Sequence, residues 1–388
     1  MYQTNLNPIS TLNNTKLFPT ISQPKILGCF SVGSKREYIP SGENLKYLNL
    51  PLIRKGKVSG NNSPLRIDLN EGFEIRVPKP DSAKQEHLDH LLKFILGNVD
   101  RLSADEDGRR ESKALNCDFV CFRGLLRMVM CTPYERKTNW IILATRYRGT
   151  IYLCAKDTPE KLQEEAQQTE KQKRFCYYGF KFEQHVLTDD FENQPPETSV
   201  PVHEGEEFCA LFGATLEGKR LLYGAEMDGI LPAGGNRPVI DKHHPSLEEL
   251  NRLEFVEVKA KRRETNQRQV DNFYRFKTRN WWCQSFLVNV SKIFVGLRDD
   301  RGIVNQIREM SLKELDRDSR NYWSASVCVN FGSQFLSQVA DAMRGVDCQN
   351  TVYRFEYDSN KFRNIFYSVY EGKNNDSFLP DWYCSVVK

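Results

Sequence analysis

The chain has 388 residues, of which 39% are hydrophobic and 27% charged, and its formal net charge is +4; this is the composition of a soluble globular protein with room for one large α/β domain or two ordinary ones. No apolar run approaches the roughly 20 residues of a membrane span, and the polar N-terminus lacks the apolar core of a secretory signal, so we expect a nuclear or cytoplasmic protein. The mild net charge excludes capture of long nucleic acid by bulk attraction, but it allows a local basic groove.

The N-terminal quarter of the chain contains a tail, one strand and one helix pattern. Residues 1–24 are polar and predict a disordered tail, which leaves residues 25–388 for the folded domain. Residues 26–32 predict a short strand. Between residues 82 and 101 the apolar residues fall at helical spacing, which predicts one helix with Ser82 as its N-cap.

The middle of the chain is dominated by strand patterns, which occupy residues 117–124, 140–145, 150–154 and 177–183. The first ends with Arg123 and Gly124, the second and third predict a hairpin, and the last ends at the carboxylate of Glu183. The highly charged stretch 158–173 predicts a helix or loop that faces solvent.

A second predicted hairpin leads into an acidic pair. Its strands, residues 207–212 and 219–225, flank a turn at Glu217–Gly218, and Glu226 and Asp228 follow directly. Residues 189–202 and 230–248 predict loops, and Ser246 with Glu249 matches a capping box for a short helix.

The C-terminal third mixes helices with short strands. We expect a helix over residues 269–290 whose buried face includes Phe273, Phe276, Trp281 and Leu287, with Gln284 on the surface nearby. Residues 293–297 and 303–310 predict two strands around a turn, and a helix near residues 331–343 precedes aromatic-rich strands. Neither a repeat nor a linker divides the chain, so the sequence predicts a single large α/β domain.

One predicted strand, residues 253–259, carries the chemistry. Side chains alternate between the faces of a strand, so Glu257 and Lys259 lie on one face and Val256 and Val258 on the other. Glu226 and Asp228 have the same two-residue spacing. Strand ends with paired carboxylates and a lysine predict a divalent-metal site for phosphodiester hydrolysis, because hard cations take oxygen ligands.

Three other sets of residues are less specific. Eleven cysteines without a CxxC spacing predict reduced, mostly buried thiols, and His243–His244 predicts a surface loop rather than a metal ligand. The basic stretch from Lys259 to Arg279 fits either a solvated face or contact with phosphates.

Six short motifs occur in an order that closely resembles the eukaryotic decapping exoribonuclease (DXO-type) family, with its PD-(D/E)xK-like active site. They are residues 122–124, 132–135, 179–183, 226–228, 257–259 and 281–286. The resemblance extends from residues 28–31 to residues 378–382, although the segments 158–173 and 230–248 match no pattern of that family.

The resemblance implies two β-sheets that form a central core flanked by helices. It also implies a Mg²⁺- or Mn²⁺-dependent enzyme, with two ions, that acts at RNA 5′ ends in mRNA quality control. Such enzymes remove unmethylated caps as the whole cap dinucleotide and remove NAD caps. They also convert 5′ triphosphates to monophosphates and degrade RNA in the 5′ to 3′ direction.

The family's site residues transfer to this chain position by position. The resemblance assigns metal binding to Glu183, Glu226, Asp228, Glu257 and the carbonyl of Val258. It implies that Lys259 and Gln284 hold the scissile phosphate or the attacking water. These two residues and the four carboxylates would carry out catalysis. It assigns substrate binding to Phe122, Arg123 and Gly124, to Arg36, Glu86 and Cys209, and also to Glu226, Lys259 and Gln284.

Several assignments have alternatives. Glu86 equally suits the start of a helix, where a carboxylate complements the helix dipole, and Cys209 equally suits the core. Base stacking by Phe122, Trp281 or Trp282 competes with core packing of the two tryptophans.

The function also has alternatives: a DNA nuclease with the same carboxylates, or a non-catalytic partner of a larger 5′–3′ exoribonuclease. The chain keeps all four carboxylates, so we expect an active enzyme. We also expect that it is a monomer and that it does not bind membranes.

Overall fold

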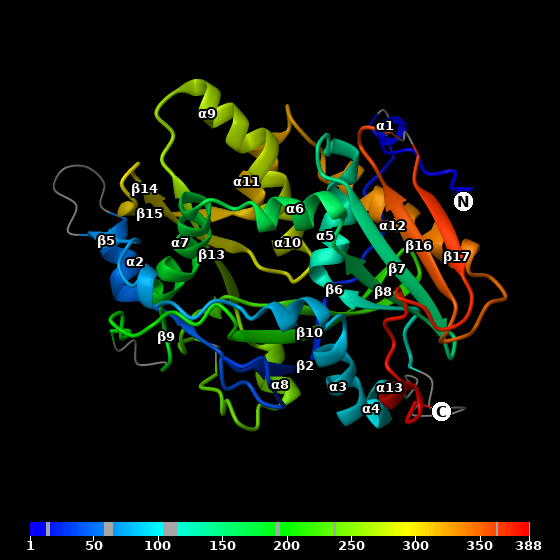
Figure 1. Ribbon diagram of the computed structural model, residues 1–388. Coiled ribbons are helices and arrows are strands. Elements are labelled where there is room, and N and C mark those ends of the chain that lie inside the picture. Colours follow the sequence, from blue (N-terminus) through cyan, green and yellow to red (C-terminus); the bar gives the residue numbers. More distant parts are fainter. Residues whose placement is uncertain are drawn as a thin grey trace.

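The computed structural model describes residues 1–12, 16–57, 65–103, 115–190, 195–235, 238–361 and 364–387. They form a mixed α/β fold with two β-sheets, one of ten strands and one of seven, between helices (Figure 1). This confirms the predicted fold class. Within these described ranges, no helix is both long and apolar enough to cross a bilayer.

The larger sheet is mostly antiparallel. Its strands, in spatial order, are β1 (Tyr2–Gln3), β17 (Phe366–Tyr370), β16 (Val352–Tyr357), β7 (Trp140–Tyr147), β8 (Thr150–Lys156), β6 (Phe119–Phe122), β11 (Lys219–Glu226), β10 (Glu207–Leu216), β2 (Lys25–Val32) and β3 (Tyr38–Ile39). The β7–β8 and β10–β11 hairpins confirm the sequence prediction. Each turns through two residues with positive φ, Arg148–Gly149 and Glu217–Gly218, which is the backbone of a type I′ turn.

The smaller sheet carries the strand that the sequence analysis placed at the centre of the chemistry. Its order is β5 (Ile67–Asp68), β15 (Ile303–Ser311), β14 (Lys292–Arg298), β13 (Phe255–Arg262), β12 (Gly229–Ile230), β4 (Tyr47–Leu48) and β9 (Leu187–Thr188). The two faces of β13 pack as predicted. Val256 and Val258 join one hydrophobic cluster, and Phe255 joins another.

Helices cover both sheets. In chain order they are α1 (Pro8–Thr11), α2 (Leu50–Gly56), η1 (Phe73–Ile75), η2 (Asp81–Gln85), α3 (Asp89–Gly97), α4 (Val99–Ser103), α5 (Arg123–Cys131), η3 (Thr132–Tyr134), α6 (Pro159–Ala166), α7 (Glu170–Val186), α8 (Leu247–Asn251), α9 (Gln267–Asn272), η4 (Phe273–Lys277), α10 (Thr278–Phe286), α11 (Leu312–Ser319), α12 (Ala325–Ala342) and α13 (Asp381–Cys384). Helices α5, α10 and α12 share a core with one face of the large sheet and with β14. Helices α3 and α13 cover its other face, and α7 packs on the small sheet.

The strand predicted at residues 177–183 is wrong, because these residues belong to helix α7. Thr169 caps this helix in a capping box with Gln172, and its buried residues fall at helical spacing: Tyr177, Tyr178, Lys181, Phe182 and Val186. The alternation of aromatic residues at 178, 180 and 182 imitates a strand. Glu183 therefore approaches the site from a helix, one turn from its end.

Three other boundaries also differ from the prediction. The helix expected at 82–101 is divided into η2, α3 and α4, because His87 adopts a positive φ of 43° between the first two; Ser82 lies inside η2 and does not cap it. The helix expected at 269–290 contains a π-helical turn and ends at Phe286, and its Phe276 is 49% exposed. Arg123 and Gly124 begin helix α5 instead of ending a strand.

The described part of residues 1–24 is not a disordered tail. Strand β1 pairs with β17, and Leu6 is buried in the core. Thr4 donates two hydrogen bonds to the carbonyl of Ile365, from its amide at 2.9 Å and its hydroxyl at 2.8 Å. These partners are distant in sequence, so the polar composition of the segment gave no sign of them.

Other predictions are confirmed. All eleven cysteines are free, and nine are buried. The charged stretch 158–173 contains α6, which buries none of its residues. The Ser246–Glu249 capping box is present at α8.

Candidate active site

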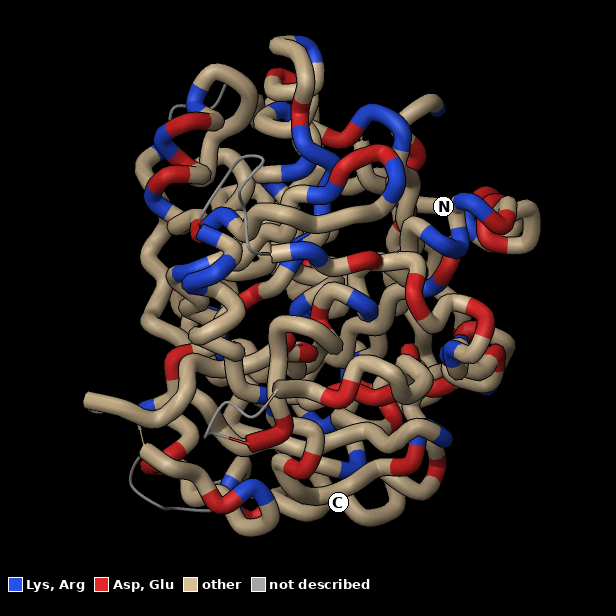
Figure 2. The backbone as a smooth tube through the Cα atoms, turned by 90° about the vertical axis from the view of Figure 1, so that its left-hand side faces the viewer, with Lys and Arg blue, Asp and Glu red and all other residues tan. Residues whose placement is uncertain are grey.

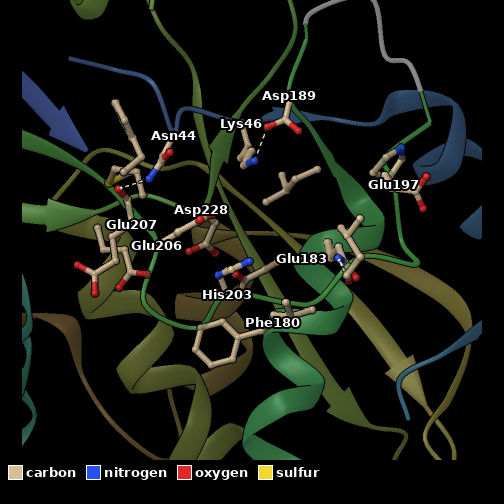
Figure 3. Close-up of a pocket in the computed structure, with 18 of the residues that line it drawn as sticks. Asn44, Lys46, Phe180, Glu183, Asp189, Glu197, His203, Glu206, Glu207 and Asp228 are labelled. Atoms are coloured by element: carbon tan, nitrogen blue, oxygen red, sulfur yellow. Dashed lines mark hydrogen bonds and ion pairs between the residues drawn. The ribbon is translucent and has the colours of Figure 1, made fainter. Parts of the chain in front are cut away.

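Three elements bring the predicted carboxylates to one cavity. Glu226 ends strand β11, Asp228 lies just beyond it, and Glu183 reaches them from helix α7. All three line a cavity of about 270 Å³. Figure 3 shows Glu183 and Asp228 facing each other across its floor, with His203 and Phe180 beside them.

The fourth carboxylate, Glu257, is 1% exposed, and both of its oxygens accept hydrogen bonds. Its Oε1 accepts a hydrogen bond from Nη1 of Arg123 at 2.7 Å, and its Oε2 accepts from Nζ of Lys259 at 2.7 Å and from Nε2 of Gln284 at 2.9 Å. Burial alone would raise the pKa of Glu257, but Lys259 and Arg123 outweigh burial and lower it to about 2. Glu257 is therefore a fixed negative charge.

Lys259 joins two of the carboxylates. Besides Glu257, its Nζ lies 3.2 Å from Oδ2 of Asp228. The same Oδ2 accepts the backbone N–H of Val258 at 2.6 Å. Burial lowers the pKa of Lys259, but Asp228 and Glu257 raise it by more, so this lysine remains charged at any physiological pH.

The other carboxylates are crowded by like charge. Burial, followed by repulsion from Asp228, raises the pKa of Glu183. Burial and Glu257 raise that of Asp228. Glu226 as a residue is exposed, yet desolvation of its carboxylate, with Glu207 and Asp228 nearby, raises its pKa to about 7. Such a cluster gains stability from a cation.

The predicted donor set fits a divalent metal, since every ligand atom is a carboxylate or carbonyl oxygen. Among the residues that the structure describes, however, no three acidic, cysteine or histidine side chains already converge as a metal-binding group. Glu257 instead faces Arg123, Lys259 and Gln284.

A second cavity, of about 330 Å³, adjoins the first. The two share Glu207 and Glu226 in their walls. Seven of the predicted substrate-binding residues line the second cavity: Arg36, Glu86, Phe122, Arg123, Gly124, Cys209 and Glu226. The other two, Lys259 and Gln284, contact Glu257 instead.

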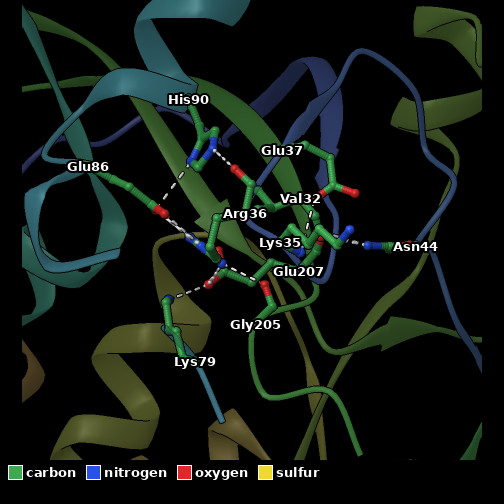
Figure 4. Close-up of polar contacts among 10 residues, drawn as sticks. All are labelled: Val32, Lys35, Arg36, Glu37, Asn44, Lys79, Glu86, His90, Gly205 and Glu207. Carbon is green, nitrogen blue, oxygen red and sulfur yellow. Dashed lines mark hydrogen bonds and ion pairs between the residues drawn. The ribbon is translucent and has the colours of Figure 1, made fainter. Parts of the chain in front are cut away.

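Arg36 is held by protein acceptors rather than left open (Figure 4). Its Nη2 lies 2.7 Å from Glu86, and its Nη1 lies 2.7 Å from Glu207 and 2.6 Å from the carbonyl of Gly205. Glu86 is the C-cap of η2, so the alternative role at a helix start does not apply. The Cys209 thiol is buried, and it also lines the cavity.

Sequence reasoning missed Glu207, Lys79 and His203. Nζ of Lys79 lies 2.6 Å from Glu207, and His203 lines the first cavity. Glu207 precedes Cys209 by two residues in β10, so strand alternation gave a usable signal for it. The sequence gave no such signal for Lys79 or His203.

Part of the basic stretch and one of the two tryptophans make contacts within the protein. Lys261, Arg262 and Arg279 form ion pairs with acidic residues of the chain, and Figure 2 shows basic and acidic segments interleaved over this side of the molecule. Trp282 is buried and stacks on Phe286, with ring centroids 4.5 Å apart. The core-packing alternative is the correct one for Trp282.

Comparison with known proteins gives consistent matches over nearly the whole chain. Residues 22–384 match the family described as "RAI1 like PD-(D/E)XK nuclease". The "Decapping and exoribonuclease protein Rai1" of Drosophila melanogaster is 33% identical over 372 residues, which cover 96% of this chain and 93% of that protein. The human "Decapping and exoribonuclease protein" is 30% identical over 373 residues, which cover 95% and 87%.

Solved structures agree in fold. Rai1 of Scheffersomyces stipitis, in complex with (3′-NADP)⁺ and calcium ion, superposes with a TM-score of 0.76 at 18% identity, over 100% of this chain and 99% of that one. Rai1 of Candida albicans, in complex with pU5-Mn²⁺, gives the same TM-score, identity and coverage.

Proposed function

Because the chain belongs to the RAI1-like PD-(D/E)XK nuclease family, we propose that it is a divalent-metal-dependent hydrolase that processes RNA 5′ ends. One observation carries this proposal: the carboxylate cavity and the cavity lined by the predicted 5′-end residues share the wall formed by Glu207 and Glu226. A 5′ terminus in the second cavity places the adjoining phosphate beside the carboxylates. The names of the curated relatives, decapping and exoribonuclease proteins, support the same activity.

Lys259 and Gln284 act on the scissile phosphate and the attacking water. Lys259 stays protonated between Asp228 and Glu257, so it offsets negative charge on the phosphate and does not serve as a base. Gln284 donates its amide N–H to Glu257, which leaves its amide oxygen to accept a hydrogen bond from water. The water oxygen loses one proton and bonds to phosphorus, the P–O bond to the leaving group breaks, and the leaving oxygen takes up a proton.

Glu183, Glu226, Asp228 and Glu257, with the carbonyl of Val258, are the proposed ligands for Mg²⁺ or Mn²⁺, in a site for two ions. A metal bound there would neutralise charge on the phosphate and lower the pKa of water. Because Glu257 accepts hydrogen bonds from Arg123, Lys259 and Gln284, we expect metal binding to change these contacts.

The proposed substrates are RNAs with incomplete caps, NAD caps, 5′ triphosphates or 5′ monophosphates. Phe122, Arg123 and Gly124 form the part of the second cavity that receives the terminal nucleotide. Removal of whole caps, conversion of triphosphates to monophosphates and 5′–3′ degradation then differ only in what occupies this cavity. We further propose that the protein is a monomer, that it acts in the nucleus or cytoplasm, and that it has a 5′–3′ exoribonuclease as a partner.

The decisive test uses RNA that carries a labelled unmethylated cap, with Mg²⁺ or Mn²⁺, and compares wild type with the Glu226→Ala/Asp228→Ala double variant. We expect wild type alone to release the intact cap dinucleotide. A DNA oligonucleotide of matched sequence with a 5′ monophosphate, beside its RNA counterpart, tests the DNA-nuclease alternative, since a site that reads the 2′-hydroxyl rejects DNA. Failure on capped, NAD-capped and monophosphate RNA alike would overturn the enzymatic proposal.

A further inference from the structure

The cavity proposed to receive the RNA 5′ end contains no excess of positive charge. Its wall holds three formal cations, Arg36, Lys79 and Arg123. The same wall holds three carboxylates, those of Glu86, Glu207 and Glu226. Burial lowers the pKa of His90, which also lines this cavity. A pocket that binds a bare polyphosphate would instead contain more cationic than anionic side chains.

Both arginines already donate hydrogen bonds to the protein, and Arg36 uses most of its five N–H groups in this way. Arg36 directs Nε and Nη2 to Glu86 and Nη1 to Glu207 and Gly205. Arg123 directs Nη1 to Glu257 and Nη2 to the carbonyl of Glu226. A guanidinium binds phosphate strongly through two parallel hydrogen bonds, and in Arg36 all but one of the N–H donors are directed to the protein. Two-point binding of phosphate by Arg36 therefore requires an existing ion pair to break.

Glu207 is the residue that balances the remaining cation. A single oxygen, Oε1, accepts from Nη1 of Arg36 at 2.7 Å and from Nζ of Lys79 at 2.6 Å. Lys79 is otherwise available, since 44% of its side chain is exposed. Figure 4 shows Lys79, Glu207, Arg36 and Glu86 in one chain of contacts. Removal of the Glu207 charge would free both Nζ of Lys79 and Nη1 of Arg36 from their shared ion-pair partner.

We propose that Glu207 is a specificity-determining residue, which selects dinucleotide caps of low negative charge over a bare 5′ triphosphate. This inference rests on the proposed function, because it concerns which RNA 5′ ends the same site prefers. Glu207 acts through Lys79 and Arg36: it lowers the positive potential of the cavity and leaves carboxylates as acceptors for the N–H and O–H groups of a terminal nucleoside.

The two kinds of RNA end differ in the charge they bring into the cavity. A triphosphate places its terminal phosphates there, with their negative charge concentrated and no compensating group. A NAD cap places a pyrophosphate bridge there, and its nicotinamide ring carries a positive charge that partly offsets the bridge. Its two riboses and its amide also supply hydrogen-bond donors for carboxylates. The balanced cavity thus favours the NAD cap.

The test measures kcat/KM for two RNAs of one sequence, one with a NAD cap and one with a 5′ triphosphate, and takes their ratio. Glu207→Gln should lower the ratio about tenfold, because Lys79 and Arg36 become free for phosphate. Lys79→Gln should raise the ratio, and the double variant should return towards wild type. Glu248→Gln, which removes the same charge at an exposed position of α8, should leave the ratio unchanged.

Each outcome decides the matter. Opposite shifts in the two single variants, with compensation in the double variant, establish selection by charge balance. An unchanged ratio in both single variants overturns the proposal, provided that each variant still cleaves 5′-monophosphate RNA. A fall in the Glu207→Gln ratio that Lys79→Gln does not reverse also overturns it, since the effect is then one of shape. If the wild-type protein cleaves none of the RNAs, the proposed function itself is refuted. This result differs from an unchanged ratio, which refutes only the role of Glu207.

Discussion

Nη1 of Arg123 lies 2.7 Å from Oε1 of Glu257, so the first residue of α5 is bonded to the middle of β13. Both side chains are buried. Arg123 also lines the 5′-end cavity and donates to the carbonyl of Glu226. One arginine therefore connects the residues proposed to bind the RNA terminus with two of the proposed metal ligands.

Substitution of Arg123 should cost both stability and activity. Arg123→Ala leaves Glu257 buried with one cationic partner instead of two, and loss of a partner from a buried ion pair costs on the order of 3 kcal/mol. The free energy of unfolding, from chemical denaturation, measures this cost. Arg127→Ala is the matched control, because this arginine lies one turn further along α5 and bonds to a neutral side chain, Asn280. Equal losses in the two variants would contradict the role of the ion pair.

Stability should fall as the pH rises through the range where Glu226 titrates. The folded pKa of Glu226 is about 7, above its ordinary value, so the folded state binds more protons than the unfolded state between these two pKa values. Rising pH thus favours unfolding across this interval. We expect the melting temperature of wild type in chelator to decline from pH 5 to pH 8, and that of Glu226→Gln to decline less. A parallel decline in both proteins would show that other groups dominate.

A divalent cation should reverse this loss. Its binding to Glu183, Glu226 and Asp228 stabilises the ionised carboxylates, and a ligand present at a hundred times its Kd adds about 2.7 kcal/mol to stability. Thermal melts at pH 8 with and without Mn²⁺ measure the effect. The Glu226→Ala/Asp228→Ala variant should show little response, and an equal rise in this variant would place the metal elsewhere.

Sequence alone predicted the parts of this site that depend on local periodicity. The alternation in β13 placed Glu257 and Lys259 on one face and Val256 and Val258 on the other, and the structure has them so. The motif order supplied the candidate ligands. Glu183 was assigned to the wrong element because alternating aromatic residues imitate a strand, although the Thr169 capping box was a readable signal for a helix.

Long-range pairing was beyond such reasoning. Arg123 and Glu257 are 134 residues apart, and no local pattern predicts that they meet. Lys79 pairs with Glu207 in the same way, across 128 residues. The charge balance of the 5′-end cavity depends on these contacts, because an arginine in a motif appears free for phosphate until its partners are known.

A side chain at Gly124 should lower activity without lowering stability. It lies in the first turn of α5 and lines the 5′-end cavity, and an added Cβ would meet no atom within 4 Å. Gly124→Ala should therefore fold with unchanged or slightly higher stability while kcat/KM on RNA falls, because the methyl group narrows the cavity. Gly97→Ala, in a similarly open position at the end of α3, is the control. A fully active Gly124→Ala enzyme would show that the terminal nucleotide does not approach this turn.

Only two thiols should react in the native protein. Cys176 and Cys348 are exposed, and the other nine cysteines are buried. Titration with a thiol reagent should detect two rapid reactions in buffer and eleven in denaturant. Replacement of both exposed cysteines by serine should abolish the rapid phase, and a rapid phase that persists would reveal that a buried cysteine is reached by local opening.

Removal of residues 1–12 should destabilise the protein, because this segment extends the large sheet. Strand β1 pairs with β17, Leu6 is 4% exposed, and the carbonyl of Leu6 accepts the N–H of Ile365 at 3.2 Å. Burial of one leucine contributes roughly 2 kcal/mol, and a disordered tail would contribute nothing. Leu6→Ala in the full chain should reproduce much of the loss, whereas Leu17→Ala, at a position 89% exposed, should have no effect. If the truncated protein and both single variants have the same melting temperature as wild type, the N-terminal segment does not stabilise the sheet in solution.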